Sequence, residues 1–346
     1  MSAPVRFGLV GYGKGARWFH APHLVAAAGC ELAGVVARSP ERRAALREDF
    51  PGVPAYGSLG ELADAGVDAI AVSTPLDTHV PLVREAVERG LPVLCDKPFA
   101  ADAAMARATV HLAERAGVPL CVYQNRRWDA DFLTVRAVVD SGRLGSVLRL
   151  ESRMEQYPPD EGYTTTGGGT LLDFGTHVVD QARVLLGPVR SVYAEVHVRE
   201  DLETFDDAFC LSLVHEGGAT SHITGDWTLR GGPGPRFRVH GSEASLVIQH
   251  DDDGQTERLL CGATPTSEGA AWGTVPPQRW GSVWRDGVGE PVPAERGAWS
   301  ELYAGFARAL RGEGPLPVDP WDSVAVLEVL DAARVSTAEG RVVTLG

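Results

Sequence analysis

The segment GYGKGA follows a short apolar run, Val5–Val10, and precedes a helical stretch, Ala16–Ala28. The first glycine allows a tight turn, and the second lets the backbone approach a pyrophosphate closely. The N-terminus of the following helix offers unpaired N–H groups and partial positive charge to phosphates. A turn of this kind between a strand and a helix predicts an N-terminal dinucleotide-binding domain. The residues predicted to bind the cofactor here are Gly11, Tyr12, Gly13, Lys14, Gly15 and Ala16.

The rest of the first third alternates apolar runs with helical stretches. The runs Leu32–Ala37, Asp68–Ser73, Val93–Cys95 and Val118–Tyr123 have the composition of buried strands. Continuous apolar strands separated by helices predict a parallel sheet that is covered on both faces. We therefore expect a doubly wound Rossmann domain over residues 1–123.

From about residue 124 the pattern changes to alternating polar and apolar positions. Phe209, Leu211 and Leu213 illustrate the alternation, and short glycine turns separate such stretches. We expect a second, α+β domain over residues 124–346, with an open, mostly antiparallel sheet and helices on one face. Within it, Gly254–Pro293 is rich in Gly, Pro, Thr and Trp without any period, and is expected to form a long ordered loop.

Charge and cysteine usage restrict the classes of partner. A net charge of −14 over 346 residues argues against sequence-independent binding to nucleic acid or to an anionic membrane. The five cysteines are scattered without CxxC spacing, so neither a disulfide framework nor a metal site is expected. The N-terminal segment lacks the pattern of a signal peptide, and no run of about 18 apolar residues occurs. We expect a cytoplasmic protein with a small-molecule partner.

The cofactor is indicated by the segment ARSPERR at the end of the second predicted strand. NAD-binding domains usually place Asp or Glu there for the ribose hydroxyls, and no carboxylate ends this strand. Arg38 can stack on adenine and pair with a 2′-phosphate, and Ser39 can donate a hydrogen bond. Arg43 or Arg42 can add positive charge, while the other of the two solvates the helix surface. NADP is therefore the expected cofactor, and NAD is the alternative.

Asp173 and His177 lie four residues apart in a predicted helix, Gly169–Leu186, so their side chains share one face. A carboxylate beside an imidazole can hold it in one tautomer and tune its proton affinity near neutral pH. His177 is thus a candidate acid and base. Gly175 lies between them. Because glycine inside a helix costs about 1 kcal/mol relative to alanine, we expect substrate or nicotinamide to approach the backbone there.

Lys97 follows a buried strand and precedes Pro98, which favours extended backbone at the lysine. Ligands bind at the carboxyl ends of strands in open parallel sheets. We expect the ammonium group to hydrogen-bond the nicotinamide ribose and the substrate oxygen. The hypothesis requires that folding bring the Lys97 ammonium and the His177 imidazole to one cleft.

Three further candidates lie between the predicted strand Asp68–Ser73 and the first turn of the next predicted helix. Thr74, Pro75 and His79 are expected to line the nicotinamide side of the cofactor. The alternative is that this segment only caps the helix, with His79 as a polar surface residue.

The junction between the two expected domains supplies another group of candidates. Asn125 and Arg127 are placed to reach substrate or the nicotinamide amide. Trp128 is a candidate platform for a sugar, or else packs between domains. Loop aromatic residues form a weaker set: Tyr157, Tyr163 and Trp280.

Five segments follow one another along the chain: GYGKGARWFHAP, TPLDTH, CDKPFA, QNRRWDADF and GGGTLLDFGTHVVDQ. With them the chain resembles the Gfo/Idh/MocA oxidoreductases over nearly its whole length, and within that family the NADP-dependent scyllo-inositol dehydrogenase-like branch. The resemblance implies hydride transfer between NAD(P) and a carbinol or ketone carbon of an inositol, sugar or related polyol, in a homodimer or homotetramer. It matches Lys97 to the catalytic lysine, Asp173 to the substrate-binding acid and His177 to the proton-transferring histidine. Asp96 stands where many relatives have Glu.

Two other readings of the same motifs stay open. The fold also includes regulators that bind NADP without turnover, although Lys97 and His177 would have no task in such a protein. Some relatives use a transient oxidation to cleave glycosidic bonds, and others reduce imines. Turnover of a nicotinamide cofactor with a panel of inositols and sugars separates a dehydrogenase from a regulator. Product analysis with a catalytic, not stoichiometric, amount of cofactor reveals hydrolysis.

Overall fold

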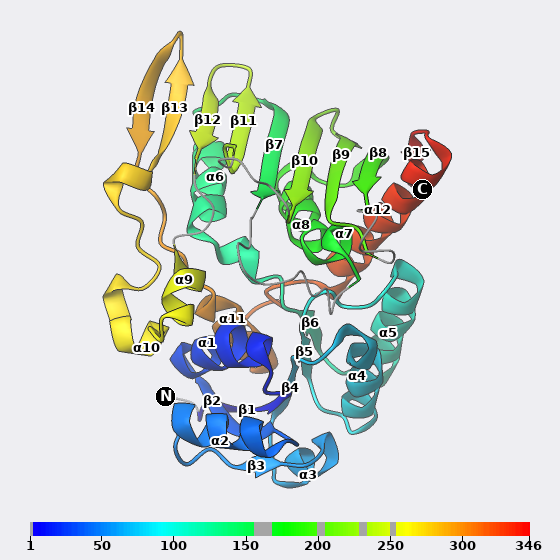
Figure 1. The fold of residues 1–346 in the computed structure, drawn as a ribbon, viewed down its shortest axis with the longest axis vertical. Helices are drawn as coiled ribbons and strands as arrows, with labels where there is room; N and C mark the ends of the chain where they lie inside the picture. The colour runs from blue at the N-terminus through cyan, green and yellow to red at the C-terminus, as the bar shows by residue number, and fades with distance from the viewer. Residues whose placement is uncertain (1–2, 156–167, 199–204, 228–233, 250–253) are drawn as a thin grey trace. The chain divides into compact units, whose positions relative to one another are not determined.

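The computed structural model describes residues 3–155, 168–198, 205–227, 234–249 and 254–346. The chain divides into two compact units, drawn in Figure 1. Unit 1 consists of Met1–Asn125, Thr256–Trp272 and Ala298–Val324. Unit 2 consists of Arg126–Gln255, Gly273–Gly297 and Ala325–Gly346.

The first unit ends two residues beyond the predicted boundary, and it also includes two later segments that the sequence pattern did not assign to it. Aromatic packing explains the second of these segments. Phe7 of the first strand lies 5.6 Å from Tyr303 and 6.1 Å from Phe306, measured between ring centroids. Side chains far apart in the sequence thus share one core.

Unit 1 contains a six-stranded sheet in the order β3-β2-β1-β4-β5-β6, with every neighbouring pair parallel. Helices cover both of its faces, with α1 and α11 on one side of β1 and β2, and α2 and α3 on the other (Figure 1). The doubly wound Rossmann prediction is confirmed. Its strands and helices are β1 Val5–Val10, η1 Ala16–His20, α1 Ala21–Ala26, β2 Cys30–Val36, α2 Pro40–Asp49, β3 Ala55–Tyr56, α3 Leu59–Asp64, β4 Ala69–Val72, η2 Leu76–Thr78, α4 His79–Glu88, β5 Val93–Cys95, α5 Ala103–Ala116, β6 Leu120–Val122, α10 Pro265–Glu268, η5 Gly269–Ala271 and α11 Ser300–Leu310.

Local sequence accounts for most of these elements. Every residue of β4, β5 and β6 is buried, as expected for central strands of a covered sheet. The side chains of Ser39, Ser58 and Asp102 cap the N-termini of α2, α3 and α5 by accepting bonds from backbone N–H groups. Gly117 ends α5 with a φ of 65°, a conformation that favours glycine.

Unit 2 contains a nine-stranded sheet in the order β14-β13-β12-β11-β7-β10-β9-β8-β15, and only the β7–β10 pair is parallel. Helix α6 packs on β11 and β12, and α8 packs on β7 and β10. This confirms the open, mostly antiparallel sheet with helices on one face. Its elements are α6 Ala130–Asp140, β7 Val147–Glu155, α7 Thr170–Asp173, α8 Gly175–Leu186, β8 Val189–His197, β9 Ala208–His215, β10 Thr220–Asp226, β11 Phe237–Gly241, β12 Ser245–Ile248, η6 Pro277–Arg279, β13 Gly281–Arg285, β14 Val288–Val292 and β15 Val343–Thr344. Three elements span the limits of the units: η3 Asn125–Trp128, α9 Gln255–Leu260 and α12 Pro320–Glu339.

Two predictions of local structure are wrong. The expected loop over 254–293 contains α9, α10 and the hairpin of β13 and β14. The hairpin turns at Asp286 and Gly287, with φ values of 51° and 80°. Asp-Gly is the strongest short-range hairpin signal in a sequence, and it was present here. The single helix expected over 169–186 is divided at Phe174 into α7 and α8.

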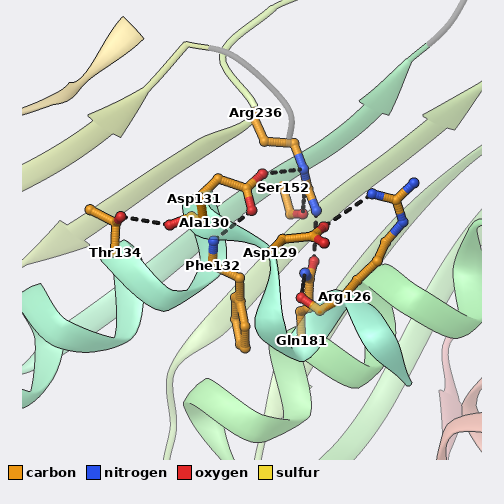
Figure 2. Close-up of polar contacts among 9 residues, drawn as sticks. All are labelled: Arg126, Asp129, Ala130, Asp131, Phe132, Thr134, Ser152, Gln181 and Arg236. Carbon is orange, nitrogen blue, oxygen red and sulfur yellow. Dashed lines mark hydrogen bonds and ion pairs between the residues drawn. The ribbon is translucent and has the colours of Figure 1, made fainter. Parts of the chain in front are cut away.

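A buried polar network fixes the helices of unit 2 to its sheet (Figure 2). The Arg236 guanidinium donates to the Ser152 hydroxyl at 2.7 Å and to the Gln181 side-chain oxygen at 2.6 Å. Its Nε lies 3.3 Å from Oδ2 of Asp131, and the two side chains are 1% and 3% exposed. Gln181 in turn donates to the backbone oxygen of Arg126 at 2.9 Å. The network therefore joins α6, α8, β7 and the segment before β11.

Replacing Asp131 by Ala leaves Arg236 buried without that carboxylate. Removing one partner of a buried pair costs about 3–5 kcal/mol, so we expect the melting temperature to fall by at least about 6 °C. The control is Glu243→Ala, since Glu243 and its partner Arg285 are 63% and 56% exposed, and a change below about 2 °C is expected there. Scanning calorimetry measures both variants. Equal melting temperatures would contradict the importance of the network.

Candidate active site

The turn after β1 lies against the end of β4. Gly11 has a φ of +101°, and a Cβ at this position would clash with the backbone oxygen of Ser73. The same Cβ would lie 2.9 Å from the Thr74 methyl group. Only glycine fits, both for conformation and for space. In the order β3-β2-β1-β4-β5-β6 the connections reverse direction between β1 and β4, and this is the point where open parallel sheets bind ligands.

The following two glycines leave the backbone of the turn accessible. Among the described residues, a Cβ at Gly13 would meet only the Arg42 Nη2 atom, at 4.0 Å. A Cβ at Gly15 would lie 3.4 Å from the Ser73 hydroxyl and 3.8 Å from a carboxylate oxygen of Asp96. The space that side chains would fill is thus open to a ligand, with a guanidinium beside it. These features fit the pyrophosphate of a dinucleotide.

The other residues of the turn have different surroundings. The buried Tyr12 hydroxyl donates to Oδ2 of Asp49 at 2.6 Å, and Arg17 holds the same carboxylate through two bonds of 2.6 and 2.7 Å. Burial, followed by the bond to Asp49, raises the pKa of Tyr12 well above its usual value. Lys14 is exposed, and its ammonium lies 5.9 Å from the Trp18 ring centroid. Tyr12 therefore anchors the turn to the end of α2.

The four cofactor candidates after β2, Arg38, Ser39, Arg42 and Arg43, divide into two pairs. Ser39 accepts a bond from the Arg42 N–H at 3.3 Å and caps α2. The Nε of Arg43 donates to the Ala37 oxygen at 2.8 Å. Arg38 and Arg42 are exposed. The sequence left open whether Arg42 or Arg43 adds charge near the cofactor, and the structure places Arg42 beside Gly13.

Lys97 follows β5 beside a part-buried ionic cluster. Its backbone N–H donates to Oδ1 of Asp96 at 2.8 Å, and the Ser73 hydroxyl donates to Oδ2 at 3.0 Å. The Nε2 of the fully buried His20 lies 3.1 Å from the same Oδ2. Burial alone would raise the pKa of Asp96, but His20, and then His79 and Lys97, offset this and hold it at about 2.

The lowered pKa of Asp96 makes the stability of the fold depend on pH. A carboxylate with a lowered folded-state pKa stabilises the fold above its ordinary pKa of 3.8. That contribution is lost as the pH falls from this value toward about 2. Asp96 is therefore charged throughout the neutral range.

His20 was not among the sequence candidates, and its position in the helix after the glycine turn was the available signal.

Thr74 and Pro75 lie at the end of β4, part-buried and exposed respectively. The Thr78 hydroxyl donates to the Thr74 hydroxyl at 2.7 Å. His79 differs from its predicted role, because its side chain is 1% exposed and both ring nitrogens face backbone oxygens. It is neither a surface residue nor open to the cofactor.

In unit 2, Asp173 ends α7 and His177 lies in the first turn of α8. Phe174 between them keeps helical φ and ψ values of −82° and −38°, so the chain continues in the same sense. Asp173 is part-buried and His177 is 5% exposed. A Cβ at Gly175 would lie 3.0 Å from the Leu330 side chain. The glycine therefore admits Leu330 of α12, which corrects the expectation that a ligand approaches there.

The candidates around residues 125–128 lie in η3. Asn125 is buried, and Trp128 is part-buried. The Arg127 guanidinium makes two bonds to the Asp180 carboxylate, at 2.7 and 2.6 Å, and the side chains are 11% and 2% exposed. Arg127 thus holds α8, the helix of His177, through a partner that sequence reasoning missed.

Of the three loop aromatic candidates, the structure describes only Trp280. The Trp280 indole N–H donates to the Val275 oxygen at 3.1 Å. Tyr157 and Tyr163 lie outside the described residues.

Within the described ranges, no cluster of three or more His, Cys, Asp or Glu side chains is arranged to hold a metal ion. No helix in this part of the chain has the length and apolar character needed to cross a bilayer.

Comparisons with known proteins agree with this architecture. The NAD-binding Rossmann-fold model of the Gfo/Idh/MocA oxidoreductase family matches residues 5–124. The model of the Gfo/Idh/MocA C-terminal domain matches residues 132–247. The chain belongs to this family of oxidoreductases, as its motifs indicated.

Individual relatives match over almost the whole chain. The scyllo-inositol 2-dehydrogenase (NADP(+)) IolW of Bacillus subtilis is 30% identical, covering 99% of this chain and 96% of that protein. The inositol 2-dehydrogenase of Rhizobium meliloti is also 30% identical, covering 99% of each. The solved structure of Bacillus subtilis yvaA, 28% identical, superimposes with a TM-score of 0.91 over 99% of this chain and 100% of that one.

Gly11→Ala tests the turn directly. The added methyl group meets the Ser73 oxygen and the positive φ disfavours it, so the turn must move. We expect the dissociation constants of NADH and NADPH to rise at least about tenfold, the equivalent of 1.4 kcal/mol. The control is Gly314→Ala in the same unit, where an added Cβ would meet no other described residue within 4 Å, apart from its chain neighbours, and φ is ordinary. Fluorescence titration measures both variants. Wild-type affinity in Gly11→Ala would contradict this reading of the turn.

Proposed function

We propose that this protein is an NADP(H)-dependent dehydrogenase that acts on a CH–OH group of a cyclic polyol or sugar, such as an inositol. The proposal rests on one observation above all. The glycine turn after β1 and the segment of Lys97 after β5 lie at the carboxyl ends of parallel strands of one sheet. A dinucleotide-binding turn and a cationic side chain are thus presented on the same edge of unit 1.

A bound nicotinamide supplies or accepts the hydride. We propose that the Lys97 ammonium donates a hydrogen bond to the substrate oxygen and lowers the cost of the negative charge that develops there. His177 accepts the hydroxyl proton during oxidation and returns it during reduction. Asp173 orients the substrate or the His177 ring. The bidentate pair of Arg127 and Asp180 supports this role by fixing the helix that carries His177.

NADP is proposed as the preferred cofactor. Arg38 follows β2 and Arg42 lies in the first turn of α2; both are exposed, and Arg42 reaches toward Gly13. Exposed guanidinium groups suit the 2′-phosphate that distinguishes NADP from NAD. The relative IolW is named as an NADP(+) enzyme, which supports the same choice.

The substrate class is proposed from the relatives, whose names include two inositol dehydrogenases and a D-apiose dehydrogenase. We also propose a homodimer or homotetramer, as in the family.

A cytoplasmic location is proposed as well. All five cysteines are free thiols, which suits the reducing cytoplasm.

Lys97→Ala and His177→Ala test the catalytic assignment. Loss of a positioned acid or base lowers kcat by about 10²–10⁴, and we expect at least this loss in each variant with a melting temperature close to wild type. His111→Ala is the control, because His111 is an exposed histidine of α5. NADP⁺ reduction is followed by absorbance with a panel of inositols and sugars. If both variants keep near wild-type kcat, the assignment is wrong.

Arg38→Asp and Arg42→Ala test the cofactor choice. A hydrogen bond to a charged group contributes about 1.5–3 kcal/mol, so each change should raise the KM for NADPH by about 10–100-fold relative to that for NADH. Arg47→Ala, in the last turn of α2, should leave the ratio unchanged. An unaltered ratio in both test variants would place the 2′-phosphate elsewhere.

A further inference from the structure

His79 connects the ends of two strands. It begins α4, and its side chain is 1% exposed. Its Nδ1 lies 2.8 Å from the backbone oxygen of Pro98, the residue after Lys97. Its Nε2 lies 2.8 Å from the backbone oxygen of Thr74, at the end of β4. One ring therefore bridges the segment that follows β4 and the segment that carries the lysine.

The chemistry of the two partners determines what the ring must donate. A carbonyl oxygen can only accept, so both nitrogens of His79 must carry protons to make both bonds. The neutral ring would leave one buried carbonyl facing a lone pair, which is repulsive. After His20, His79 is one of the groups that lower the pKa of Asp96.

His215 in unit 2 shows the contrast. It is fully buried and also uses both ring nitrogens, with Gly187 oxygen and the Ser221 hydroxyl each at 2.9 Å. A hydroxyl can donate as well as accept, so the neutral ring satisfies both partners. Burial lowers the pKa of His215. The two histidines are equally enclosed, but only His79 requires two donors.

We propose that His79 is a positioning residue for Lys97, acting as a doubly donating clamp between the Thr74 and Pro98 carbonyl groups. The clamp fixes the backbone on the C-terminal side of the lysine. On the N-terminal side, the lysine N–H is held by Asp96. The proposal rests on the catalytic role of Lys97 proposed above.

Two substitutions separate the clamp from simple packing. His79→Phe keeps a ring of similar size and removes both donors, whereas His79→Gln keeps an N–H₂ group that can serve at least one carbonyl. Misplacement of a catalytic group by about 1 Å can cost 10²-fold in rate. We expect kcat to fall by about 10–100-fold in His79→Phe and by less in His79→Gln. The substrate KM and the NADPH dissociation constant should stay within about threefold, because the clamp does not bind either ligand.

The controls use the other buried histidine and the lysine. His215→Phe should lower the melting temperature and leave kcat unchanged when it is measured well below that temperature. In a double-mutant cycle, His79→Phe added to Lys97→Ala should lower kcat by less than about threefold, because residues that act as one unit are not additive.

Each outcome has a defined meaning. Rank order of kcat from wild type through His79→Gln to His79→Phe, with non-additivity toward Lys97→Ala, supports the clamp. A full additional loss in the double variant overturns it, as does wild-type kcat in His79→Phe. Failure of both His79 variants to fold also overturns it, in favour of a role in stability alone. If Lys97→Ala itself retains wild-type kcat, the proposed function fails instead.

Discussion

The contact between the turn after β1 and the end of β4 is the constraint on which the nucleotide-binding unit depends. Gly11 can approach the Ser73 carbonyl only because it has no side chain and can adopt a positive φ. That approach sets the backbone of Gly13 and Gly15 over the same strand ends that present Thr74, Asp96 and Lys97. The open surface of the turn and the ionic cluster beneath it are thus consequences of one packing event.

Charge is managed differently in the two units. In unit 1 the Asp96 carboxylate lies under the glycine turn, where an uncompensated negative charge would repel a phosphate. His20 and His79 offset it, together with the backbone N–H of Lys97 and the Ser73 hydroxyl. In unit 2 the guanidinium groups of Arg127 and Arg236 form structural hydrogen bonds, to Asp180 and Ser152 respectively. Arginines that look equally available in the sequence therefore serve different ends: Arg42 faces the turn, and Arg127 braces a helix.

Patterns with local causes could be predicted. Buried strands, helix caps and the glycine turn follow from a few neighbouring residues, so the sequence alone predicts the Rossmann sheet and the position of Lys97 after β5. Partner choice between distant residues could not be predicted in the same way. The sequence indicates that His79, Arg127 and Arg236 are polar, but not that they bond Pro98, Asp180 and Asp131. The same limit applies to α11, whose aromatic residues pack on Phe7. The hairpin at Asp286 and Gly287 is different, because its signal, Asp-Gly, is local and predicts a two-residue hairpin turn.

The fit of Gly175 against Leu330 has an evolutionary consequence. A methyl group at position 175 would stand 3.0 Å from the Leu330 side chain, so the helix that carries His177 and the last long helix are matched in size at one point. Alanine becomes tolerable at 175 when the residue at 330 shrinks, for instance to valine. The two positions are therefore expected to covary among related sequences, and a library that randomises them together should recover more folded variants than one that varies either alone.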